Sequence, residues 1–349
     1  MHTIQAWAAP AAGKPLAPTT IERREPRPND VVIDIRFCGV CHSDIHQARD
    51  EWSGATFPMV PGHEIVGVVT RVGAEVTRFA VGDRAGVGCM VDSCRACPPC
   101  VDAVEQFCEK GNAPTYNGTE MDRRTPTFGG YSTEIVVDER FVLRVPDRLD
   151  LAATAPLLCA GITTYSPLRQ FRCKAGDRVG VVGLGGLGHM AVKLAASMGA
   201  KVTVLSTSEA KAADAHRLGA ADFVVTRNPS AFARLAGTLD LIIDTVSAPH
   251  DYDAYLGLLR SRGTMVLVGA PPSALSIHPF SLIMGGKRLA GSLIGGISET
   301  QEMLDHCAEH GVVSDVEIIS VQQINEAYER VMRSDVRYRF VIDIASLRG

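Results

Sequence analysis

Hydrophobic positions along the chain follow two different patterns, which meet near residue 150. Before this point, short β-rich runs are separated by glycine and proline, as in VVIDIRF, EIVGVVTRVG, GGYSTEIVV and FVLRVP. After it, nearly continuous apolar runs such as RVGVV, KVTVLST, ADFVV, LDLIIDTV and TMVLVG alternate with predicted helices, one of them over 209–218. Strands buried on both faces of a parallel sheet have this continuous character. The pattern predicts an irregular β-rich domain, followed by a doubly wound α/β domain over residues 154–300.

The character of the sequence changes again in its last part. SETQEMLDHCAEHG predicts a helix with Ser298 as its N-cap and Glu302 in its first turn. VEIISVQQI and RYRFVIDI predict two further strands. We therefore treat residues 301–349 as a separate closing segment.

Composition narrows the class of protein. Of 349 residues, 46% are hydrophobic and 21% are charged, with a net charge of −4, as in an ordinary globular protein. This charge gives no electrostatic reason to expect nucleic acid or an anionic membrane as a partner. MHTIQAWAAPAAGKP lacks the basic and apolar regions of a signal peptide, and no run approaches the ~18–20 apolar residues of a membrane span. We expect a cytoplasmic protein.

A glycine-rich string follows the predicted strand RVGVV and opens a helix. It reads Gly183, Leu184, Gly185, Gly186, Leu187 and Gly188, which fits the G-x-G-x-x-G fingerprint in the context that dinucleotide binding requires. The glycines allow a tight turn, close approach of a pyrophosphate and close packing of helix on strand. An ordinary strand-to-helix turn is the alternative interpretation.

The end of the next predicted strand indicates which dinucleotide binds. An NAD enzyme usually carries Asp or Glu there, whereas this chain has Ser206, Thr207 and Ser208, with Lys211 just after. Three hydroxyls and an ammonium suit a 2′-phosphate, so we favour NADP. The alternative is that Ser208 caps the following helix and Lys211 is a solvated surface charge.

Four of the ten cysteines fall close together and predict a metal site. Their spacing is Cys94-x2-Cys97-x2-Cys100-x7-Cys108. Four thiolates suit a closed, structural, tetrahedral zinc site with no position left for a substrate. An iron–sulfur cluster is the competing metal, although the bacterial cluster motif has a shorter last spacing and a following proline. Two disulfides are a further alternative that a reducing compartment disfavours.

A second candidate metal site has to be assembled from distant residues. Cys41 lies in GVCHSDIH, His63 and Glu64 in PGHE, and Cys159 in LLCAGIT. Two thiolates and an imidazole make a neutral zinc site with an open fourth position. Spacing alone does not show that they converge, and each residue taken alone is more typical of a buried packing residue than of a ligand.

Long ordered motifs decide between these possibilities by resemblance. They are GVCHSDIHQARDEW, PMVPGHEIVGVV, GVGCMVDSCRACPPC, PLLCAGITTYSPL, VVGLGGLGHMAVKLA and DVRYRFVID. Together they resemble the zinc-containing medium-chain alcohol dehydrogenases, in the branch of cinnamyl alcohol dehydrogenases and bacterial aldehyde reductases. The resemblance implies a GroES-like catalytic zinc domain over 1–153, a Rossmann domain over 154–300, and a return to the catalytic domain over 301–349. It also implies that Cys41, His63 and Cys159 hold the catalytic zinc, while the four clustered cysteines hold a structural one.

The same resemblance suggests catalytic roles near Cys41. Ser43 is similar to the hydroxyl that supplies the proton, and the resemblance implies that it also contacts the cofactor. His46 is similar to the outer imidazole that passes the proton from solvent. Asp44 is similar to the carboxylate that orients His63. Glu64 stays ambiguous, because as a ligand it would weaken the Lewis acid, but it could replace water or product transiently. A turn hydroxyl and a surface histidine are the alternatives for Ser43 and His46.

The resemblance also suggests residues that line the cofactor and the substrate, on less specific motifs. The expected cofactor-lining residues are Thr163, Thr245, Gly269, Ser292, Leu293, Ile294 and Arg339, with Arg337 competing for the role of Arg339 and with His42 and His189 as possible phosphate neighbours. Trp52 and Phe57 are expected at the substrate. Pro114-Thr115 and Leu293 stand where the plant lignin enzymes tend to carry aromatic residues, which weakens stacking with a cinnamyl ring. This favours a broad primary alcohol and aldehyde range, including aromatic aldehydes.

Two other functions remain open at this point. An NAD-linked zinc polyol dehydrogenase would usually carry an acid where Ser206 stands. A non-catalytic, zinc-stabilised dinucleotide-binding protein would need no intact ligand set and proton relay. We expect a small-molecule substrate and a homodimer, in which the strand around RLAGSLI pairs with its copy.

Overall fold

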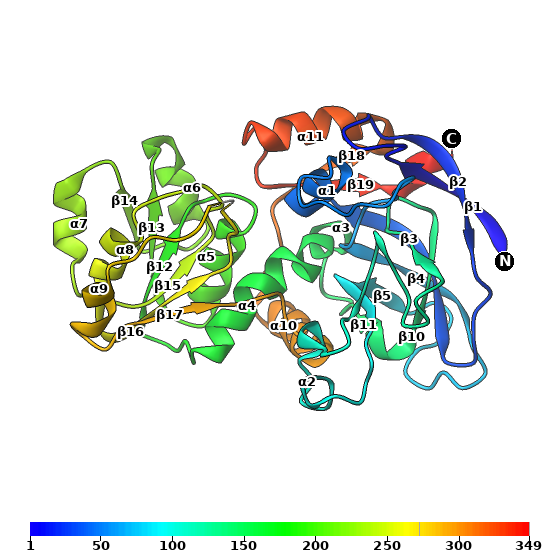
Figure 1. Ribbon diagram of the computed structural model, residues 1–349, viewed down its shortest axis with the longest axis horizontal. Helices are drawn as coiled ribbons and strands as arrows, with labels where there is room; N and C mark the ends of the chain where they lie inside the picture. The colour runs from blue at the N-terminus through cyan, green and yellow to red at the C-terminus, as the bar shows by residue number, and fades with distance from the viewer. Residues whose placement is uncertain (272, 349) are drawn as a thin grey trace. The chain divides into compact units, whose positions relative to one another are not determined.

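The computed structural model describes residues 1–271 and 273–348. The chain forms two compact units (Figure 1). The first unit comprises Met1–Cys159 and Gly295–Gly349, and the second comprises Ala160–Ile294. Each unit has its own sheet, in agreement with the two hydrophobic patterns of the sequence.

A seven-stranded sheet forms the core of the first unit. Its order is β11-β5-β4-β3-β19-β18, with β10 also paired to β3. The strands are β3 (Asp30–Gly39), β4 (Ile65–Val72), β5 (Arg84–Val87), β10 (Glu134–Asp138), β11 (Leu143–Arg144), β18 (Val316–Ser320) and β19 (Arg339–Asp343). β3 runs antiparallel to β4, β10 and β19, so the closing segment of the chain completes this sheet. Val31, Val32 and Ile33 on β3 are fully buried, which explains the apolar run in this strand.

Smaller elements surround this sheet. The hairpin of β1 (His2–Ala8) and β2 (Ala17–Arg23) was not anticipated from the sequence. The short strands are β6 (Met90–Asp92), β7 (Ala113–Pro114), β8 (Gly118–Thr119) and β9 (Pro126–Thr127). The helices before residue 160 are α1 (His42–Ala48), α2 (Pro98–Val101), η1 (Glu105–Phe107), η2 (Glu139–Phe141), α3 (Leu151–Thr154) and η3 (Ala155–Leu158).

The closing segment corrects two sequence-based predictions. Helix α10 (Ile297–His310) has Gly296, not Ser298, as its N-cap, and its first turn carries Glu299 rather than Glu302. The cap comes from elsewhere in the chain, because the Glu105 carboxylate accepts the Ile297 N–H at 3.1 Å. A Cβ at position 296 would collide with the backbone of Ala103, so only glycine fits at the start of this helix.

The predicted strand VEIISVQQI also ends earlier than expected. β18 stops at Ser320, and the chain continues as η5 (Val321–Gln323), α11 (Ile324–Met332), β19 and η6 (Ile344–Leu347). A capping box between Ser320 and Gln323 turns the chain from strand to helix. Helix α11 buries Ile324, Tyr328 and Val331, whose spacing is helical rather than alternating.

The second unit contains a six-stranded, all-parallel sheet of order β14-β13-β12-β15-β16-β17. The strands are β12 (Arg178–Val182), β13 (Lys201–Ser206), β14 (Asp222–Val225), β15 (Leu239–Asp244), β16 (Leu259–Leu267) and β17 (Arg288–Gly291). The helices are α4 (Ala160–Gln170), α5 (Gly188–Ser197), η4 (Glu209–Lys211), α6 (Ala212–Arg217), α7 (Pro229–Leu235), α8 (Tyr252–Leu258) and α9 (Pro279–Ile283). Numbered along the chain, the strand order is 3-2-1-4-5-6, the Rossmann order.

The reversal point of this order positions the predicted cofactor residues. β12 lies between β13 and β15, and the glycine-rich string begins directly after β12. In doubly wound sheets, ligands bind outside the carboxyl ends of the strands at this point. Within residues 1–271 and 273–348, no single helix is long and apolar enough to cross a membrane, although one bent pair of helices passes the same test.

Candidate metal centres and cofactor site

The first unit brings together the four residues that the sequence predicted for the open metal site. Cys41 lies between β3 and α1, His63 and Glu64 directly precede β4, and Cys159 follows η3. One ligand atom from each of these residues lies within 4.8 Å of the others, and all four residues are buried. The chain thus converges at this point although Cys41 and Cys159 are 118 positions apart.

The donor set fits a zinc ion. The Cys41 and Cys159 sulfurs are 3.9 Å apart. Two thiolates bound tetrahedrally at ordinary zinc–sulfur distances are separated by about 3.8 Å. Two sulfurs and one imidazole nitrogen give the neutral ligand set of a catalytic zinc with one position left for substrate. The contact between the two sulfurs lowers the pKa of the Cys41 thiol well below its ordinary value and raises the pKa of Cys159, so the pair holds a proton that a zinc ion would displace.

Asp44 orients His63 from behind. Its fully buried carboxylate lies 3.2 Å from His63 Nδ1, and it accepts the Cys41 N–H at 2.9 Å. The Gly62 N–H and the Tyr131 hydroxyl also donate to it, each at 3.2 Å. With Nδ1 facing this carboxylate, Nε2 of the imidazole is left for a metal. Although burial acts against the charged imidazole, the negative charges of Cys89 and Asp44 raise the pKa of His63.

Glu64 forms a buried ion pair with Arg339, which lies 275 positions away on β19. Burial raises the pKa of Glu64 to about 7, while the positive charge of Arg339 acts in the opposite direction. Oε1 binds the Arg339 guanidinium, whereas the buried Oε2 has no hydrogen-bond partner in the described part of the chain. This arrangement leaves Glu64 one carboxylate oxygen beside the metal ligands. The predicted phosphate contact of Arg339 stays a prediction.

Two residues at this site were not singled out from the sequence. The Cys89 thiol is hydrogen-bonded to Cys159, and this bond lowers the pKa of Cys89. The Tyr116 ring stacks on the His63 ring, with 5.7 Å between centroids and 16° between planes. Both stand in stretches that resemble ordinary packing segments. The one local signal is that both lie within eight residues of the cysteine cluster Cys94–Cys108.

Ser43 and His46 lie on one face of helix α1, because residues three apart on a helix are neighbours. Ser43 Oγ is 3.7 Å from the Cys41 sulfur, so the hydroxyl reaches the edge of the metal site. His46 is half-buried and forms an ion pair with Glu51. The exposed Trp52 ring packs beside His46 at 5.0 Å. Phe57 is half-buried in the following loop, and the substrate contacts of both aromatic residues stay predictions.

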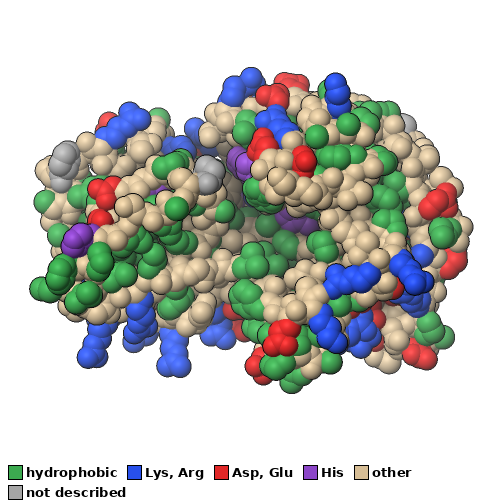
Figure 2. All heavy atoms as spheres, in the orientation of Figure 1, with side chains coloured by type: hydrophobic (Ala, Val, Ile, Leu, Met, Phe, Trp, Pro, Cys, Tyr) green, Lys and Arg blue, Asp and Glu red, His purple; other side chains and the backbone are tan. Residues whose placement is uncertain are grey.

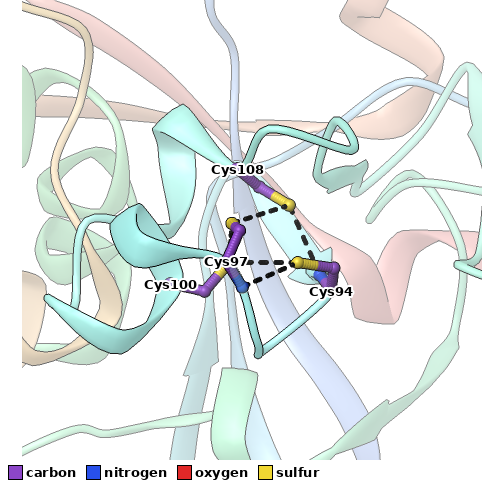
Figure 3. Close-up of side chains that lie close together, drawn as sticks. All are labelled: Cys94, Cys97, Cys100 and Cys108. Carbon is purple, nitrogen blue, oxygen red and sulfur yellow. Dashed lines mark hydrogen bonds between the residues drawn. The ribbon is translucent and has the colours of Figure 1, made fainter.

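The four clustered cysteines form a second, separate centre in the first unit (Figure 3). Their sulfurs lie within 4.8 Å of one another. Cys94 and Cys100 are 3.8 Å apart, Cys97 and Cys100 are 3.4 Å apart, and Cys97 and Cys108 are 3.9 Å apart. These separations match four thiolates around one tetrahedral zinc ion. Because every position is a protein sulfur, the site is closed and structural.

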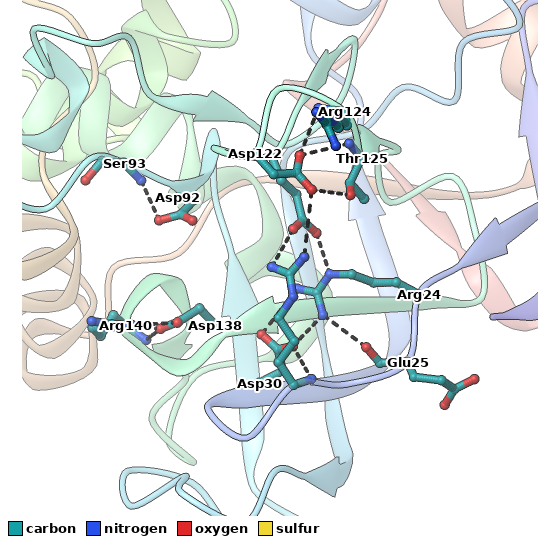
Figure 4. Close-up of polar contacts among 12 residues, drawn as sticks. Arg24, Glu25, Asp30, Asp92, Ser93, Asp122, Arg124, Thr125, Asp138 and Arg140 are labelled. Atoms are coloured by element: carbon teal, nitrogen blue, oxygen red, sulfur yellow. Dashed lines mark hydrogen bonds and ion pairs between the residues drawn. The ribbon is translucent and has the colours of Figure 1, made fainter.

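Backbone amides and arginines hold the cysteine loop. The N–H groups of Ala96 and Cys97 lower the pKa of the Cys94 thiol to about 6. Arg95 binds Asp92 and Asp138. Arg140 pairs with the same Asp138 at 2.8 Å (Figure 4). The loop is therefore tied to strands β6 and β10 by ion pairs on either side of the cysteine cluster.

The second unit bears the glycine-rich string at the end of β12. Gly183 adopts a left-handed φ of 86°, and a Cβ there would lie 2.8 Å from Val246 Cγ2. A Cβ at Gly188 would collide with the carbonyl of Gly183, so helix α5 starts closely against the strand. Gly185 faces open space within its unit, which leaves room for a ligand at the turn. These three positions behave as the fingerprint requires.

The residues predicted to select NADP surround the end of β13. The Ser208 N–H donates to Ser206 Oγ at 3.4 Å, and Lys211 Nζ donates to the Leu184 carbonyl of the glycine string at 2.8 Å. The Ser208 hydroxyl accepts no capping hydrogen bond at the start of η4. Ser208 is nevertheless the N-cap residue of η4 by its backbone conformation, so both interpretations of Ser208 stay open. The ammonium of Lys211 is held beside the turn.

Other predicted cofactor residues of the second unit lie near the same edge or in the segment after β17. Thr245 and Gly269 follow the parallel neighbours β15 and β16. Ser292 donates its N–H to Leu267 at 3.1 Å, and Leu293 is exposed. Thr163 is buried on α4. His189 is fully buried in α5, with Nδ1 3.2 Å from the Gly185 carbonyl, and its predicted phosphate contact stays a prediction.

Comparison with known proteins assigns the chain to a family. The family model described as "Alcohol dehydrogenase GroES-like domain" matches residues 27–147, and "Zinc-binding dehydrogenase" matches residues 186–309. The chain belongs to the zinc-containing alcohol dehydrogenase family. This confirms the predicted fold, a GroES-like domain combined with a Rossmann-type domain.

Three members of this family indicate the branch. The chain is 58% identical over 350 residues to "NADP-dependent alcohol dehydrogenase C 1" of Mycolicibacterium smegmatis, which covers all of both chains. It is 55% identical to "Aldehyde reductase YahK" of Escherichia coli over 99% of both chains. Its fold matches a cinnamyl alcohol dehydrogenase structure from Sorghum bicolor with a TM-score of 0.95, at 47% identity, over 99% of this chain and 98% of that one. The predicted branch of cinnamyl alcohol dehydrogenases and bacterial aldehyde reductases is confirmed.

Proposed function

We propose that this chain is a zinc-dependent, NADP(H)-using alcohol dehydrogenase that works mainly as an aldehyde reductase. The carrying observation is the buried, neutral set of Cys41, His63 and Cys159, which leaves one zinc position open. The family relatives named for NADP-dependent alcohol dehydrogenase and aldehyde reductase activity support the reaction class. Primary alcohols and aldehydes, including aromatic ones, are the proposed substrates.

Each part of the chain has a proposed role in this reaction. The first unit supplies the catalytic residues and holds two zinc ions, one catalytic and one structural. The second unit binds the dinucleotide through the glycine string and the end of β13. When bound, zinc polarises the aldehyde oxygen as a Lewis acid and NADPH supplies the hydride.

The chain's own groups manage the proton of the reaction. Ser43 lies at the edge of the metal site and donates its hydroxyl proton to the oxygen of the reduced substrate. His46, on the same helix face, exchanges protons with solvent and resupplies Ser43. Glu51 holds the imidazole of His46 through an ion pair. Asp44 is proposed as a positioning residue outside this relay, because its carboxylate contacts His63 and the backbone N–H groups of Cys41 and Gly62.

The end of β13 determines the proposed preference for NADPH. Ser206, Thr207 and Ser208 carry hydroxyls where an NAD enzyme usually has a carboxylate, and hydroxyls can bind a 2′-phosphate. Lys211 is held beside the turn by its bond to the Leu184 carbonyl, which keeps a positive charge close to the phosphates. Ser206 is buried, whereas the side chains of Thr207 and Ser208 are exposed and available to a ligand.

A homodimer is proposed from an uncovered apolar surface on the second unit. Phe280, Ile283 and Met284 are 59%, 65% and 74% exposed, and Figure 2 shows hydrophobic side chains gathered over this region. Within residues 1–271 and 273–348, strand β17 pairs only with β16, so its outer edge offers unpaired backbone groups to a second copy. An exposed apolar patch beside a free strand edge is typical of an interface between identical chains. We also propose a cytoplasmic location, because thiolate metal sites persist in a reducing compartment.

The test of the proposed activity uses the zinc-loaded protein with benzaldehyde and NADPH. We expect oxidation of NADPH, followed at 340 nm, together with stoichiometric formation of benzyl alcohol. Removal of the catalytic zinc by a chelator abolishes the reaction, and added zinc restores it. A purified, zinc-loaded protein that binds NADPH but converts no member of a panel of alkyl and aryl aldehydes would support a non-catalytic role instead.

A further inference from the structure

The loop between β15 and α8, residues 245–251, is closed by a pair of charged residues. We propose that Asp244 and His250 form a positioning pair that holds Thr245 and Val246 against the glycine-rich turn, and so sets the affinity for NADP(H). This inference rests on the proposed function, since it concerns the dinucleotide site of the second unit. Neither residue is among the positions that sequence motifs assigned to the cofactor.

Asp244 is the anchor of the pair. It is the last residue of β15, and only 1% of its surface is exposed. Its backbone carbonyl accepts the N–H groups of Val268 and Gly269, each at 3.0 Å, which fixes it to the end of β16. Its Oδ1 accepts the Val246 N–H at 3.1 Å. The other oxygen, Oδ2, lies 3.0 Å from Nε2 of His250.

His250 closes the loop from its far end. Its Nδ1 lies 2.9 Å from the Ala248 carbonyl, and a carbonyl only accepts, so Nδ1 carries a proton. Within the described part of the chain, Nε2 makes no aligned hydrogen bond, yet it faces the Asp244 carboxylate at ion-pair distance. Because an unprotonated Nε2 and a carboxylate oxygen both carry lone pairs, the contact is attractive only when a proton lies on one of the two groups. Tyr252 and Tyr255 flank the imidazole at 4.2 and 5.2 Å and restrict its movement.

The residues between these two ends touch the turn directly. The Thr245 hydroxyl donates to the Val182 carbonyl at 2.7 Å, immediately before the glycine string. A Cβ at Gly183 would lie 3.1 Å from this hydroxyl oxygen, and one at Gly188 would lie 3.3 Å from it. A Cβ at Gly183 would lie 2.8 Å from Val246 Cγ2, and one at Gly269 would lie 2.5 Å from the Val246 carbonyl oxygen. A displacement of the loop therefore changes the support of the turn that receives the dinucleotide.

The energetics favour a positioning role over simple stabilisation. Burial raises the pKa of Asp244, and the positive charge of His250 opposes this effect. Buried ion pairs add little net stability, but loss of one partner leaves an uncompensated buried charge. Without His250, the Asp244 carboxylate gains from contact with water, which requires the loop to move away from β15. The loop carries Thr245 and Val246 with it.

The experiment measures NADPH binding to the zinc-loaded protein in the absence of aldehyde, by calorimetry or nucleotide fluorescence. His250→Phe keeps a ring between the tyrosines but removes both nitrogens. We expect roughly tenfold weaker NADPH binding for this variant. His250→Gln restores a polar partner for Asp244, and its affinity returns to within about threefold of wild type. His216→Phe is the matched control, because His216 makes the same Nδ1–carbonyl contact, at 3.0 Å to Ala220, but lies on the surface without a carboxylate partner.

Steady-state kinetics supply a second readout. The KM for NADPH rises in His250→Phe, while kcat at saturating NADPH stays within about twofold of wild type, since no reacting group is lost. Asp244→Asn, which keeps the shape of the side chain, is measured in parallel, and we expect it to weaken NADPH binding as well. It takes the place of His250→Phe if that variant fails to fold. Wild-type NADPH affinity in folded His250→Phe or Asp244→Asn overturns the inference alone. A wild-type protein that does not bind NADPH overturns the proposed function and the inference together.

Discussion

Nδ1 of His63 lies 3.2 Å from a carboxylate oxygen of Asp44, and this contact determines which imidazole nitrogen is free for metal. Asp44 is fully buried and receives further donors from Cys41, Gly62 and Tyr131. All of these groups need an acceptor at Asp44. The carboxylate thus holds both a zinc ligand and the backbone of a second ligand in place.

Asp44→Asn tests this arrangement. In Asp44→Asn, an NH2 group replaces one carboxylate oxygen, and each of these oxygens faces two donors in the wild type. The NH2 group cannot accept their hydrogen bonds, so His63 loses its fixed orientation. We expect the affinity of the catalytic zinc to fall about 10- to 100-fold, the usual effect of losing such a partner. A competitive chelator titration measures it, and the zinc held by the cysteine cluster stays bound. The control is Asp147→Asn, a carboxylate on the surface of the same unit. Unchanged zinc affinity in Asp44→Asn would contradict the positioning role.

The two candidate metal sites predict about two zinc ions per chain, and the one held by the cysteine cluster is structural. Cys94→Ala should lose one zinc ion and lower the thermal midpoint, because structural zinc contributes to folding free energy. Elemental analysis and a melting curve check both effects. Cys173→Ala removes a thiol outside both clusters and should change neither quantity. Iron in the purified protein, or an unchanged metal content in Cys94→Ala, would reject the assignment.

The proton relay predicts an order of severity among three substitutions. Cys41→Ser is worst because the metal site loses a ligand. Ser43→Ala keeps both zinc ions and NADPH binding but lowers kcat by roughly 10²-fold or more, the scale of a positioned proton donor. His46→Gln is milder, since solvent partly replaces an outer shuttle, and its pH–rate profile changes. A deuterated cofactor shows whether hydride transfer limits the rate. Near wild-type turnover of Ser43→Ala, with hydride transfer limiting, would mean that the proton arrives by another route.

The apolar surface around α9 predicts a dimer in solution. The double substitution Ile283→Asp and Met284→Asp places charges on this surface, so the protein should sediment as a monomer while the wild type sediments as a dimer. Val101→Asp is the matched control, because Val101 is 71% exposed but belongs to the first unit. A monomeric wild type, or a double variant of dimeric mass, would refute the proposed interface.

Local patterns were sufficient to predict much of this molecule. Continuous apolar runs predicted the parallel sheet, since its strands are buried on both faces. The glycine string and the cysteine cluster each consist of residues close together in the sequence, so their spacing was enough to predict a dinucleotide site and a metal site. The strand order and the pairing of β19 with β3 became known only from the structure.

What the sequence could not predict depends on contacts between distant residues. Helix α10 begins before Ser298 because Glu105, far away in the chain, caps it. The ion pair of Glu64 and Arg339 and the stacking of Tyr116 on His63 have no local signal either. Thr245 was expected at the cofactor, but the contact between Asp244 and His250 could be seen only once the conformation of the loop was known.

The most direct test of the account is the ratio of kcat/KM for NADPH over NADH, measured with the zinc-loaded enzyme and benzaldehyde. It probes zinc-dependent aldehyde reduction and the reading of Ser206, Thr207, Ser208 and Lys211 in one assay. The account predicts a ratio of at least about tenfold, which corresponds to about 1.4 kcal/mol in favour of NADPH. Equal efficiency with both dinucleotides, or a preference for NADH, would contradict it.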